Sequence, residues 1–376
     1  MKALDGLLVV SIEQAVAAPL CSSRLAEAGA RVIKIERSEG DFARRYDSAA
    51  CGESSYFAWL NGNKESLCVD FKTTEGAELL WSLIESADVV IQNLAPGALS
   101  NAGFSTHAMQ SRNKRLIVCN ISGYGESSML AERRGYDLLI QAESGLISVS
   151  GAPDHPGRIG VSLCDIGAGV TAYSGILEAL IKRGITGEGC ELSVSLFDVA
   201  AEWMSVPFIH AHYGEGSPKP AGLKHPSIAP YGDFVCSDHR LVLVSIQNER
   251  EWVRLCEDVL NAPELLKQVN YQSNNARVAH RESLEADIGR ITATMTSDEF
   301  SHRLLQAGIA YGAIHTAEDL MEHPAFRARQ SSTADDQVMS LPAHPIRWTG
   351  TVKDKSAKTP ALGEHTEAIK AELGKR

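Results

Sequence analysis

Asp165 is the side chain of this sequence that is best placed to do chemistry. It lies in the segment SLCDIGAG at residues 162–169, between an apolar stretch and a glycine-containing helix start. A carboxylate at a helix N-terminus meets free backbone N–H groups and the positive end of the helix dipole. The neighbouring glycines allow a ligand to approach the backbone closely. The segment predicts a functional carboxylate or, alternatively, a helix N-cap without a further role.

A second carboxylate, Asp137, lies near the start of the block GYDLLIQAESG at residues 135–145. It follows Tyr136 and precedes an expected helix, so it is placed to act as an N-cap or to support a nearby catalytic group. Asp137 and Asp165 are therefore the two candidate catalytic residues.

Several common ligand-binding motifs are absent from the sequence. It has no G-x-x-x-x-G-K-[ST] loop for nucleotide phosphates and no G-x-S-x-G elbow for a serine nucleophile. The first expected strand–helix turn, residues 13–19, lacks the G-x-G-x-x-G of dinucleotide sites. His210 and His212 have no further ligand at metal spacing and are interpreted as structural. We expect neither a nicotinamide cofactor nor a metal.

The bulk composition narrows the class of protein. With 44% hydrophobic and 22% charged residues, the chain can bury the core of an ordinary globular protein. Its net charge of −11 argues against nucleic acid or an anionic membrane as a partner. Eight scattered cysteines without a C-x-x-C pair are typical of reduced core residues, and no signal peptide or long apolar span is recognisable. A cytoplasmic protein is expected.

The elements that must position the two carboxylates alternate between strand and helix. Short apolar runs predict strands, and amphipathic segments with glycine stops predict helices. We expect strand 7–12, helix 19–28, strand 31–35, helix 74–86, strands 88–92 and 116–121, helix 166–182, strand 190–196 and helix 197–213. A linker at 214–222, a hairpin over 233–246 that turns at 237–240, helices to about 319 and a last helix at 364–373 follow. The alternation predicts an α/β fold with a doubly wound parallel sheet.

Eight segments resemble, in the same order, those of the class III CoA-transferases, the formyl-CoA and carnitine CoA-transferase family. They are LDG at 4–6, VAAP at 16–19, VIKIER at 32–37 with Gly40-Asp41, NGNKESL at 61–67 with VDFK at 69–72, ADVV at 87–90, NLAPG at 93–97, ISGYG at 121–125, and the Asp137 block followed by Asp165-Ile166. The resemblance covers nearly all of the chain before the linker and fades after it.

The resemblance implies a Rossmann-like large domain, residues 1–213 completed by 330–376, and a linker with a smaller α+β domain at 214–329. It also implies an interlocked homodimer. Asp165 is expected to be the nucleophile, with Asp137 supporting it. The residues expected to bind CoA are Ala15, Ala17, Arg37, Val69, Lys72, Asn93, Pro96, Gly97, Ala98 and Arg134.

The expected CoA site contains two candidate phosphate-binding cations and two departures from the family pattern. Arg37 and Lys72 can meet CoA phosphates, although the alternative for each is a solvated surface charge. Asn101 stands where the family has an arginine that helps to hold CoA, and Val16 stands where some members have a glutamine. The details of CoA and acyl-group binding therefore depart from the family pattern.

The implied reaction moves CoA from an acyl-CoA, with succinyl-CoA as the expected donor, to a free acid. Asp165 attacks the thioester, and aspartyl-anhydride and aspartyl-CoA intermediates follow. Backbone N–H groups of residues 167–169 are expected to stabilise the oxyanions. The segments 225–232 and 247–252 look more like the branch acting on C4–C5 dicarboxylates such as itaconate or mesaconate. Arg45, Tyr136 and His225 are the expected substrate-binding residues, with Arg134 and Arg158 as further candidates to pair the distal carboxylate.

Two alternatives remain open from the sequence. The α-methylacyl-CoA racemases share much of this pattern, but their catalytic histidine position is Tyr136 here and their glutamate position is Asn248. A phenol with an ordinary pKa near 10 is a poor substitute for an imidazole base. The other alternative is a thioesterase or a non-catalytic acyl-CoA-binding protein, against which the presence of both Asp137 and Asp165 argues.

Overall fold

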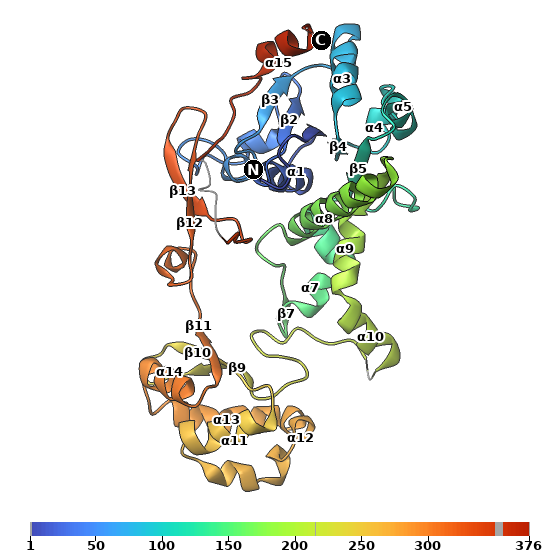
Figure 1. Cartoon of the computed structure of the whole chain (residues 1–376). Helices are drawn as coiled ribbons and strands as arrows, with labels where there is room; N and C mark the ends of the chain where they lie inside the picture. The colour runs from blue at the N-terminus through green and yellow to red at the C-terminus, as the bar shows by residue number, and fades with distance from the viewer. Residues whose placement is uncertain (1, 215, 350–355, 376) are drawn as a thin grey trace. The chain divides into compact units, whose positions relative to one another are not determined.

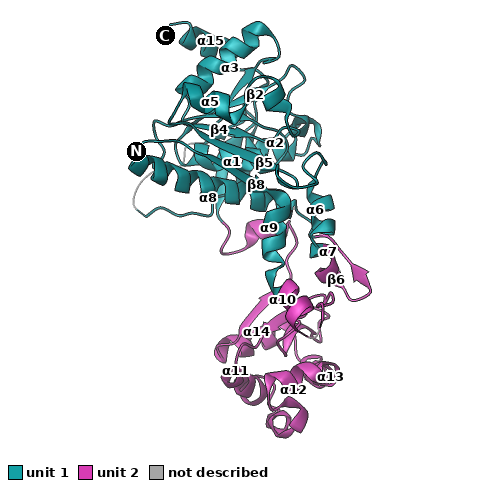
Figure 2. Ribbon diagram, turned by 90° about the vertical axis from the view of Figure 1, so that its right-hand side faces the viewer, with its two compact units in different colours: residues 1–146, 159–206, 327–376 teal, residues 147–158, 207–326 magenta. Residues whose placement is uncertain are grey.

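The computed structural model describes residues 2–214, 216–349 and 356–375. The chain forms two compact units, coloured separately in Figure 2. The first contains residues 1–146, 159–206 and 327–376, and the second contains residues 147–158 and 207–326. The first unit is therefore built from three separate stretches of chain, the last of which is the C-terminal tail. The functional domain boundaries at 213 and 329 stay a prediction, and Glu215 of the expected linker lies outside the described residues.

The first unit is built on a six-stranded parallel sheet, of which Figure 1 labels β2, β3, β4 and β5. Its strand order is β3-β2-β1-β4-β5-β8. This is the order of a dinucleotide-binding Rossmann sheet. The expected doubly wound parallel sheet is confirmed. Its strands are β1 (Leu8–Ile12), β2 (Arg31–Glu36), β3 (Glu65–Cys68), β4 (Val89–Gln92), β5 (Ile117–Ser122) and β8 (Glu191–Ser195).

Successive residues of the central strand β1 serve two different hydrophobic cores, as the alternation of a strand requires. Val9 belongs to the core that α1, α8 and α9 cover, whereas Val10 belongs to the core that α3, α5 and α15 cover. The first face carries α1 (Ala17–Glu27), α8 (Leu163–Thr186) and α9 (Leu196–Trp203). The second carries α3 (Thr74–Ser86), α5 (Thr106–Arg112) and α15 (Thr366–Leu373).

The helix α8 is long and apolar enough to cross a membrane by length and composition alone, and it is the one such helix among the described residues. Its Ala168, Ala172 and Ile176 are fully buried and pack in the same core as α1 and the sheet. We therefore assign α8 as a core helix of the first unit, a role that its apolar composition also explains.

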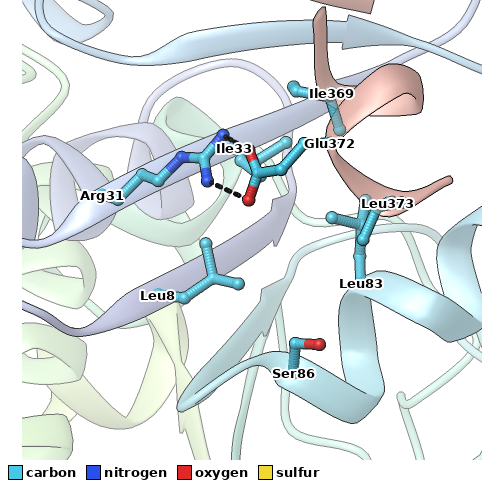
Figure 3. A pocket seen from close by; sticks show the side chains of 8 residues that line it. All are labelled: Leu8, Arg31, Ile33, Leu83, Ser86, Ile369, Glu372 and Leu373. Carbon is cyan, nitrogen blue, oxygen red and sulfur yellow. Dashed lines mark hydrogen bonds and ion pairs between the residues drawn. The ribbon is translucent and has the colours of Figure 1, made fainter. Parts of the chain in front are cut away.

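The C-terminal tail packs back on the first unit. Figure 3 shows Ile369 and Leu373 of α15 against the sheet, beside an ion pair of 2.9 Å between Arg31 and Glu372. Arg31 also pairs with Glu65 of β3 at 2.8 Å. Upstream of α15, β14 (Ala357–Lys358) adds to a sheet of β12 (Ala328–Ser332) and β13 (Val338–Pro342). Residues 327–376 thus belong to the first unit.

The second unit carries an antiparallel sheet of order β11-β10-β9. It consists of β9 (Tyr231–Val235), β10 (Leu241–Ser245) and β11 (Ala310–Ala313). The β9–β10 hairpin turns at residues 237–240, where the sequence predicts it. The helices of this unit are α10 (Ser205–Tyr213, from the unit boundary), α11 (Glu249–Arg254), η2 (Leu255–Val259), η3 (Pro263–Lys267), η4 (Val269–Tyr271), α12 (Asn274–Ala279), α13 (Arg281–Thr292), α14 (Ser297–Gln306) and η5 (Asp319–Glu322).

The expected helix over residues 197–213 is wrong, because the chain forms two helices, α9 and α10, that meet at Met204. Pro207 explains the break, since its ring would clash with the carbonyl of Trp203 in a continuous helix.

The remaining short elements are η1 (Phe42–Arg45), α2 (Ser55–Leu60), α4 (Ala98–Asn101), α6 (Asp137–Glu143), α7 (Leu146–Val149), β6 (Gly151–Ala152) and β7 (His155–Pro156).

Candidate active site

The carboxyl ends of the parallel strands bring most of the expected CoA-binding residues to one edge of the sheet. Ligands of such sheets bind outside this edge, where the strand order reverses; here this is between β1 and β4. The residues that follow β1 to β4 are, in order, Ala15 and Ala17, Arg37, Val69 and Lys72, and Asn93, Pro96, Gly97 and Ala98.

Asp165 is the third residue of α8, whose N-cap is Ser162. The interpretation of Asp165 as the N-cap itself is wrong, because the helix begins three residues before the expected start at Ile166. The side chain of Ser162 makes no capping hydrogen bond. Among the described residues, none donates a hydrogen bond to the Asp165 carboxylate or forms an ion pair with it. Within the described parts of the chain, no contact therefore assigns the carboxylate of Asp165 a structural role.

Asp137 is the first residue of α6, and its carboxylate caps α8 from outside. Its Oδ1 accepts a hydrogen bond of 2.8 Å from the backbone N–H of Cys164, and its Oδ2 accepts one of 2.7 Å from the amide of Gln141. Gln141 is fully buried, and its side-chain oxygen accepts from the N–H of Ile159 at 3.0 Å. Asp137 is thus fixed on both oxygens beside the first turn that carries Asp165.

The pKa of Asp165 is raised to about 7. Burial is the largest cause, since removal from water disfavours the charged form, and the negative charge of Asp137 is the second. Near neutral pH, Asp165 therefore exchanges between acid and carboxylate. A carboxylate of this basicity is a stronger nucleophile than an exposed aspartate, and perturbed carboxylates of this kind are typical of functional sites.

The glycines that follow Asp165 serve helix packing. A Cβ on Gly167 would lie 2.2 Å from the ring of Trp203, and one on Gly169 would lie 2.6 Å from the carbonyl oxygen of Ala17. The N–H groups of these glycines lie inside α8, where they bond to the preceding turn. The expectation that residues 167–169 supply oxyanion donors is therefore wrong.

The turn between β1 and α1 lies against the start of α8. Ile166 packs with Ala15 and Val16 in a small hydrophobic cluster. Asn93 is committed to the same turn, because its side chain accepts from the N–H of Gln14 at 2.9 Å and donates to the Gln14 carbonyl at 2.8 Å. The loops that follow β1 and β4 are thus joined directly beside the helix that carries Asp165.

Three aromatic residues that the sequence analysis did not single out form one side of this region. The ring centroid of Tyr46 lies 5.7 Å from that of Phe42 and 5.4 Å from that of Tyr56. Tyr56 packs on the same small hydrophobic cluster as Ile166. Burial raises the pKa of Tyr46 to about 12, and the charges of Asp41 and Asp165 contribute. No local pattern marks these rings, because only the folded chain brings them toward Asp165.

An open pocket of about 740 Å³ lies between the residues after β3 and the helices α3 and α4. Two of the expected CoA-binding residues, Lys72 and Ala98, line it together with Asn101. Phe71 and Trp81 provide aromatic surface on its wall. The pocket therefore combines a cation with flat apolar surface, the features that a phosphorylated heteroaromatic ligand requires.

The other expected binding residues are dispersed. Arg37, Arg134 and Tyr136 are exposed, and the guanidinium of Arg45 donates to the carbonyl of Glu39 at 2.6 Å. His225 belongs to the second unit, where it stacks on Tyr231 with ring centroids 5.2 Å apart and accepts from the N–H of Ser227. Within the described parts of the chain, no group of three or more His, Cys, Asp or Glu side chains is arranged to hold a metal ion.

Comparison with known proteins extends over nearly the whole chain. Residues 4–366 match the family described as CoA-transferase family III. The chain is 34% identical to an acyl-CoA transferase of Fusarium pseudograminearum over 99% of this chain and 85% of that protein. It is 31% identical to a succinate–glutarate CoA-transferase of Agrobacterium fabrum over 98% and 95% of the two chains. The crystal structure of a CaiB/BaiF family protein from Brucella suis superposes with a TM-score of 0.84 at 33% identity, over 99% of each chain. The chain therefore belongs to CoA-transferase family III and is a class III CoA-transferase.

Proposed function

We propose that this enzyme transfers CoA from succinyl-CoA to a C4–C5 dicarboxylate with Asp165 as the nucleophile. The observation that carries the assignment is a half-buried carboxylate with a raised pKa and without a hydrogen-bond or ion-pair partner among the described residues, on a helix that a second, fully engaged carboxylate caps. A carboxylate with a purely structural role would be paired, because an unpaired buried charge is costly.

The reaction begins when an oxygen of the Asp165 carboxylate attacks the thioester carbonyl of the donor. The C–S bond breaks, CoA leaves as a thiolate, and Asp165 becomes a mixed anhydride. The thiolate then attacks the aspartyl carbonyl, which releases the first acid and leaves an aspartyl-CoA thioester. The acceptor carboxylate attacks this thioester, and the released thiolate attacks the new acyl carbonyl, which gives the new acyl-CoA and restores Asp165.

Asp137 has an electrostatic role in these reaction steps. Asp165 is charged as the attacking carboxylate and neutral as an anhydride or a thioester, so the repulsion from Asp137 acts only on the attacking form. This repulsion raises the energy of the nucleophile before attack and disappears in both covalent intermediates, which favours their formation. Asp137 itself is held by the Cys164 N–H and the Gln141 amide, so it is not available to attack.

The pocket beside α3 is assigned to the phosphorylated nucleoside end of CoA. Lys72 supplies the cation for a phosphate, and the aromatic wall formed by Phe71 and Trp81 suits the adenine. Asn101 replaces the arginine of the family at this pocket and offers an amide without charge. Lys72 is therefore the residue on which phosphate attraction in this pocket rests.

The choice of a dicarboxylate acceptor rests on the segments 225–232 and 247–252 and on the relative from Agrobacterium fabrum, which is named for succinate and glutarate. The distal carboxylate of such an acid requires a cation when it is buried. Arg45, Arg134 and Tyr136 are the proposed acyl-site residues of the first unit, and His225 is the proposed substrate-binding residue of the second unit.

The substrate assignment is tested by mass spectrometry of acyl-CoA products from succinyl-CoA and a panel of free acids. We expect glutarate, itaconate and mesaconate to be better acceptors than butyrate or formate by about tenfold or more in kcat/KM, an effect of one paired carboxylate. Equal rates with formate, oxalate and itaconate would reject the dicarboxylate assignment while leaving CoA transfer intact.

The racemase alternative is tested in the same reaction with an α-deuterated 2-methylacyl-CoA. Asn248, at the position of the second base of that group, caps α11 by accepting from the N–H of Glu251 at 3.0 Å. An amide engaged in this way does not serve as a base. We expect exchange of CoA without loss of deuterium; loss of deuterium would indicate racemisation, and free CoA alone would indicate a thioesterase.

We also propose an interlocked homodimer in the cytoplasm. The chain leaves the first unit at residue 206, forms the second unit and returns at residue 327, so that the tail closes the path. All eight cysteines are free thiols, which suits a reducing compartment. Sedimentation at decreasing concentration should show one dimeric species down to low nanomolar protein; a folded monomer on dilution would exclude interlocking.

A further inference from the structure

Four charged side chains lie buried beneath the turn between β1 and α1. Their exposed fractions are 4% for Glu13, 0% for Lys34, 4% for Asp41 and 3% for Lys64. The set contains two acids and two bases, so it is neutral as a whole. Buried charges are costly and persist only when each is paired. The mechanism proposed above uses none of them, so their position beneath this turn requires another explanation.

The four groups form one connected cluster. Lys34 Nζ donates to Asp41 Oδ2 at 2.9 Å and lies 3.3 Å from Glu13 Oε1, and Lys64 Nζ donates to Glu13 Oε1 at 2.7 Å. Burial opposes the charge on Glu13, but the neighbouring lysines outweigh it and lower the pKa of Glu13 to about 2. Burial likewise opposes the charge on Lys34, and the attraction of Glu13 and Asp41 raises its pKa. Glu13 and Lys34 are therefore charged at neutral pH, whereas burial lowers the pKa of Lys64 to about 8.

The second carboxylate oxygen of Asp41 accepts hydrogen bonds from the backbone, including that of the turn. Its Oδ1 accepts from the N–H of Ala43 at 2.9 Å and from the N–H of Ala15 at 3.1 Å. Ala15 has a φ of 64°, in the left-handed region that a residue with a Cβ rarely adopts. Such a conformation persists only where the surroundings impose it. The bond from Ala15 to Asp41 is a direct means of imposing it.

We infer that Asp41, anchored by Lys34, is a positioning residue that holds Ala15 in the left-handed conformation and so keeps the β1–α1 turn preformed for acyl-CoA. The inference rests on the proposed binding of CoA at this edge of the sheet. A turn that is ordered before binding saves the cost of ordering it in the complex. Asp41 touches neither CoA nor the reacting atoms in this assignment, so its loss weakens binding and leaves the chemical step unchanged.

The test is a double-mutant cycle of Asp41→Asn and Ala15→Gly, read as KM for acyl-CoA and kcat. Asn at position 41 has a similar shape but loses the ionic anchor to Lys34. Glycine adopts a positive φ without a steric penalty, so it needs no anchor. We expect Asp41→Asn to raise KM for acyl-CoA about fivefold or more with kcat nearly unchanged. A change of this size corresponds to the free-energy cost of one strained backbone conformation. In the Ala15→Gly background the same change should raise KM by less than about twofold.

Asp336→Asn is the matched control, because Asp336 pairs with Lys358 at 2.7 Å on the surface. Its KM should stay within about twofold of the wild type, as for an exposed pair. An equal rise of KM for Asp41→Asn in both backgrounds, or a fall of kcat at constant KM, would overturn the inference.

If Asp41→Asn does not fold by circular dichroism, Ala15→Val provides the decisive variant, since a β-branched side chain strongly disfavours a positive φ. A raised KM at unchanged kcat supports the inference, and an unchanged KM overturns it. The proposed function fails separately: wild-type enzyme would then exchange CoA with no acid at all.

Discussion

The carboxylate of Asp137 accepts a hydrogen bond of 2.8 Å from the backbone N–H of Cys164, so one aspartate caps the helix that presents the other. The bond places a fixed negative charge beside the first turn of α8. The pKa of Asp165 is raised by burial and by this charge together. A helix cap and the basicity of the proposed nucleophile therefore depend on the same side chain.

CoA exchange should increase with pH, because only the ionised Asp165 can attack. We expect kcat/KM to follow a single ionisation near pH 7, the value to which the pKa of Asp165 is raised. In Asp137→Asn the apparent pKa should fall below that of the wild type but stay above that of an ordinary aspartate, because burial, the larger cause, remains. The measurement is a pH–rate profile of both enzymes. An identical profile in the variant would show that Asp137 does not act on Asp165 electrostatically.

Asp165→Asn should stabilise the fold at high pH. A folded-state pKa above the ordinary value means that the protonated group suits the fold, so stability is full at low pH and is lost as pH rises toward 7. The variant lacks this loss, and we expect a gain of about 2–4 kcal/mol at pH 8 and almost none at pH 4. Urea denaturation at both pH values measures it. Equal effects at the two pH values would contradict the raised pKa.

Gln141→Glu should raise the apparent pKa of exchange further. The new side chain can still accept from the N–H of Ile159, but as a carboxylate it cannot donate to Asp137, and it adds a negative charge beside it. The pH–rate profile should move upward, with activity near pH 7 reduced several-fold. Gln272→Glu, the same change on the surface of the second unit, is the control. A profile that moves equally in both variants would exclude a specific role for Gln141.

Lys72→Met should weaken the binding of acyl-CoA. A charged hydrogen bond to a phosphate contributes about 1.5 kcal/mol, so KM should rise about tenfold with little change in kcat. The effect should diminish as ionic strength increases, because screening already weakens the attraction. Lys267→Met, at an exposed lysine of the second unit, serves as the reference. A KM that stays within twofold of this reference would exclude a phosphate contact at Lys72.

The sequence predicts the elements that local signals define. The helix Thr74–Ser86 is correct at both ends, because Thr73 caps it by accepting from the N–H of Gly76. The predicted start of α8 is wrong by three residues, because the side chain that accepts from its first turn is Asp137, 27 residues before Cys164. Local sequence cannot reveal a cap supplied by another helix. The glycine pattern after Asp165 therefore predicts a helix start and a ligand contact, whereas Gly167 and Gly169 lie inside α8 and serve packing.

The same limit applies to the candidate site. The sequence identifies Asp137 and Asp165 as candidates because they stand in recognisable segments. Gln141 carried one weak signal, its position four residues after Asp137 on the expected helix, where the two side chains share a face. The ionic pairing of Lys34 with Asp41 carried none, since a lysine in a predicted strand gives no indication of the partner that it meets after folding.

The most direct test of the central claim is to trap the acyl-enzyme during turnover. Wild-type enzyme is incubated with succinyl-CoA, treated with hydroxylamine, digested and mapped by mass spectrometry. The account predicts a hydroxamate on Asp165, its absence from the Asp165→Ala variant, and loss of CoA exchange in that variant although it still folds and binds CoA. A hydroxamate on Asp137, or exchange retained at a tenth of the wild-type rate or more by Asp165→Ala, would contradict the assignment of Asp165 as the nucleophile.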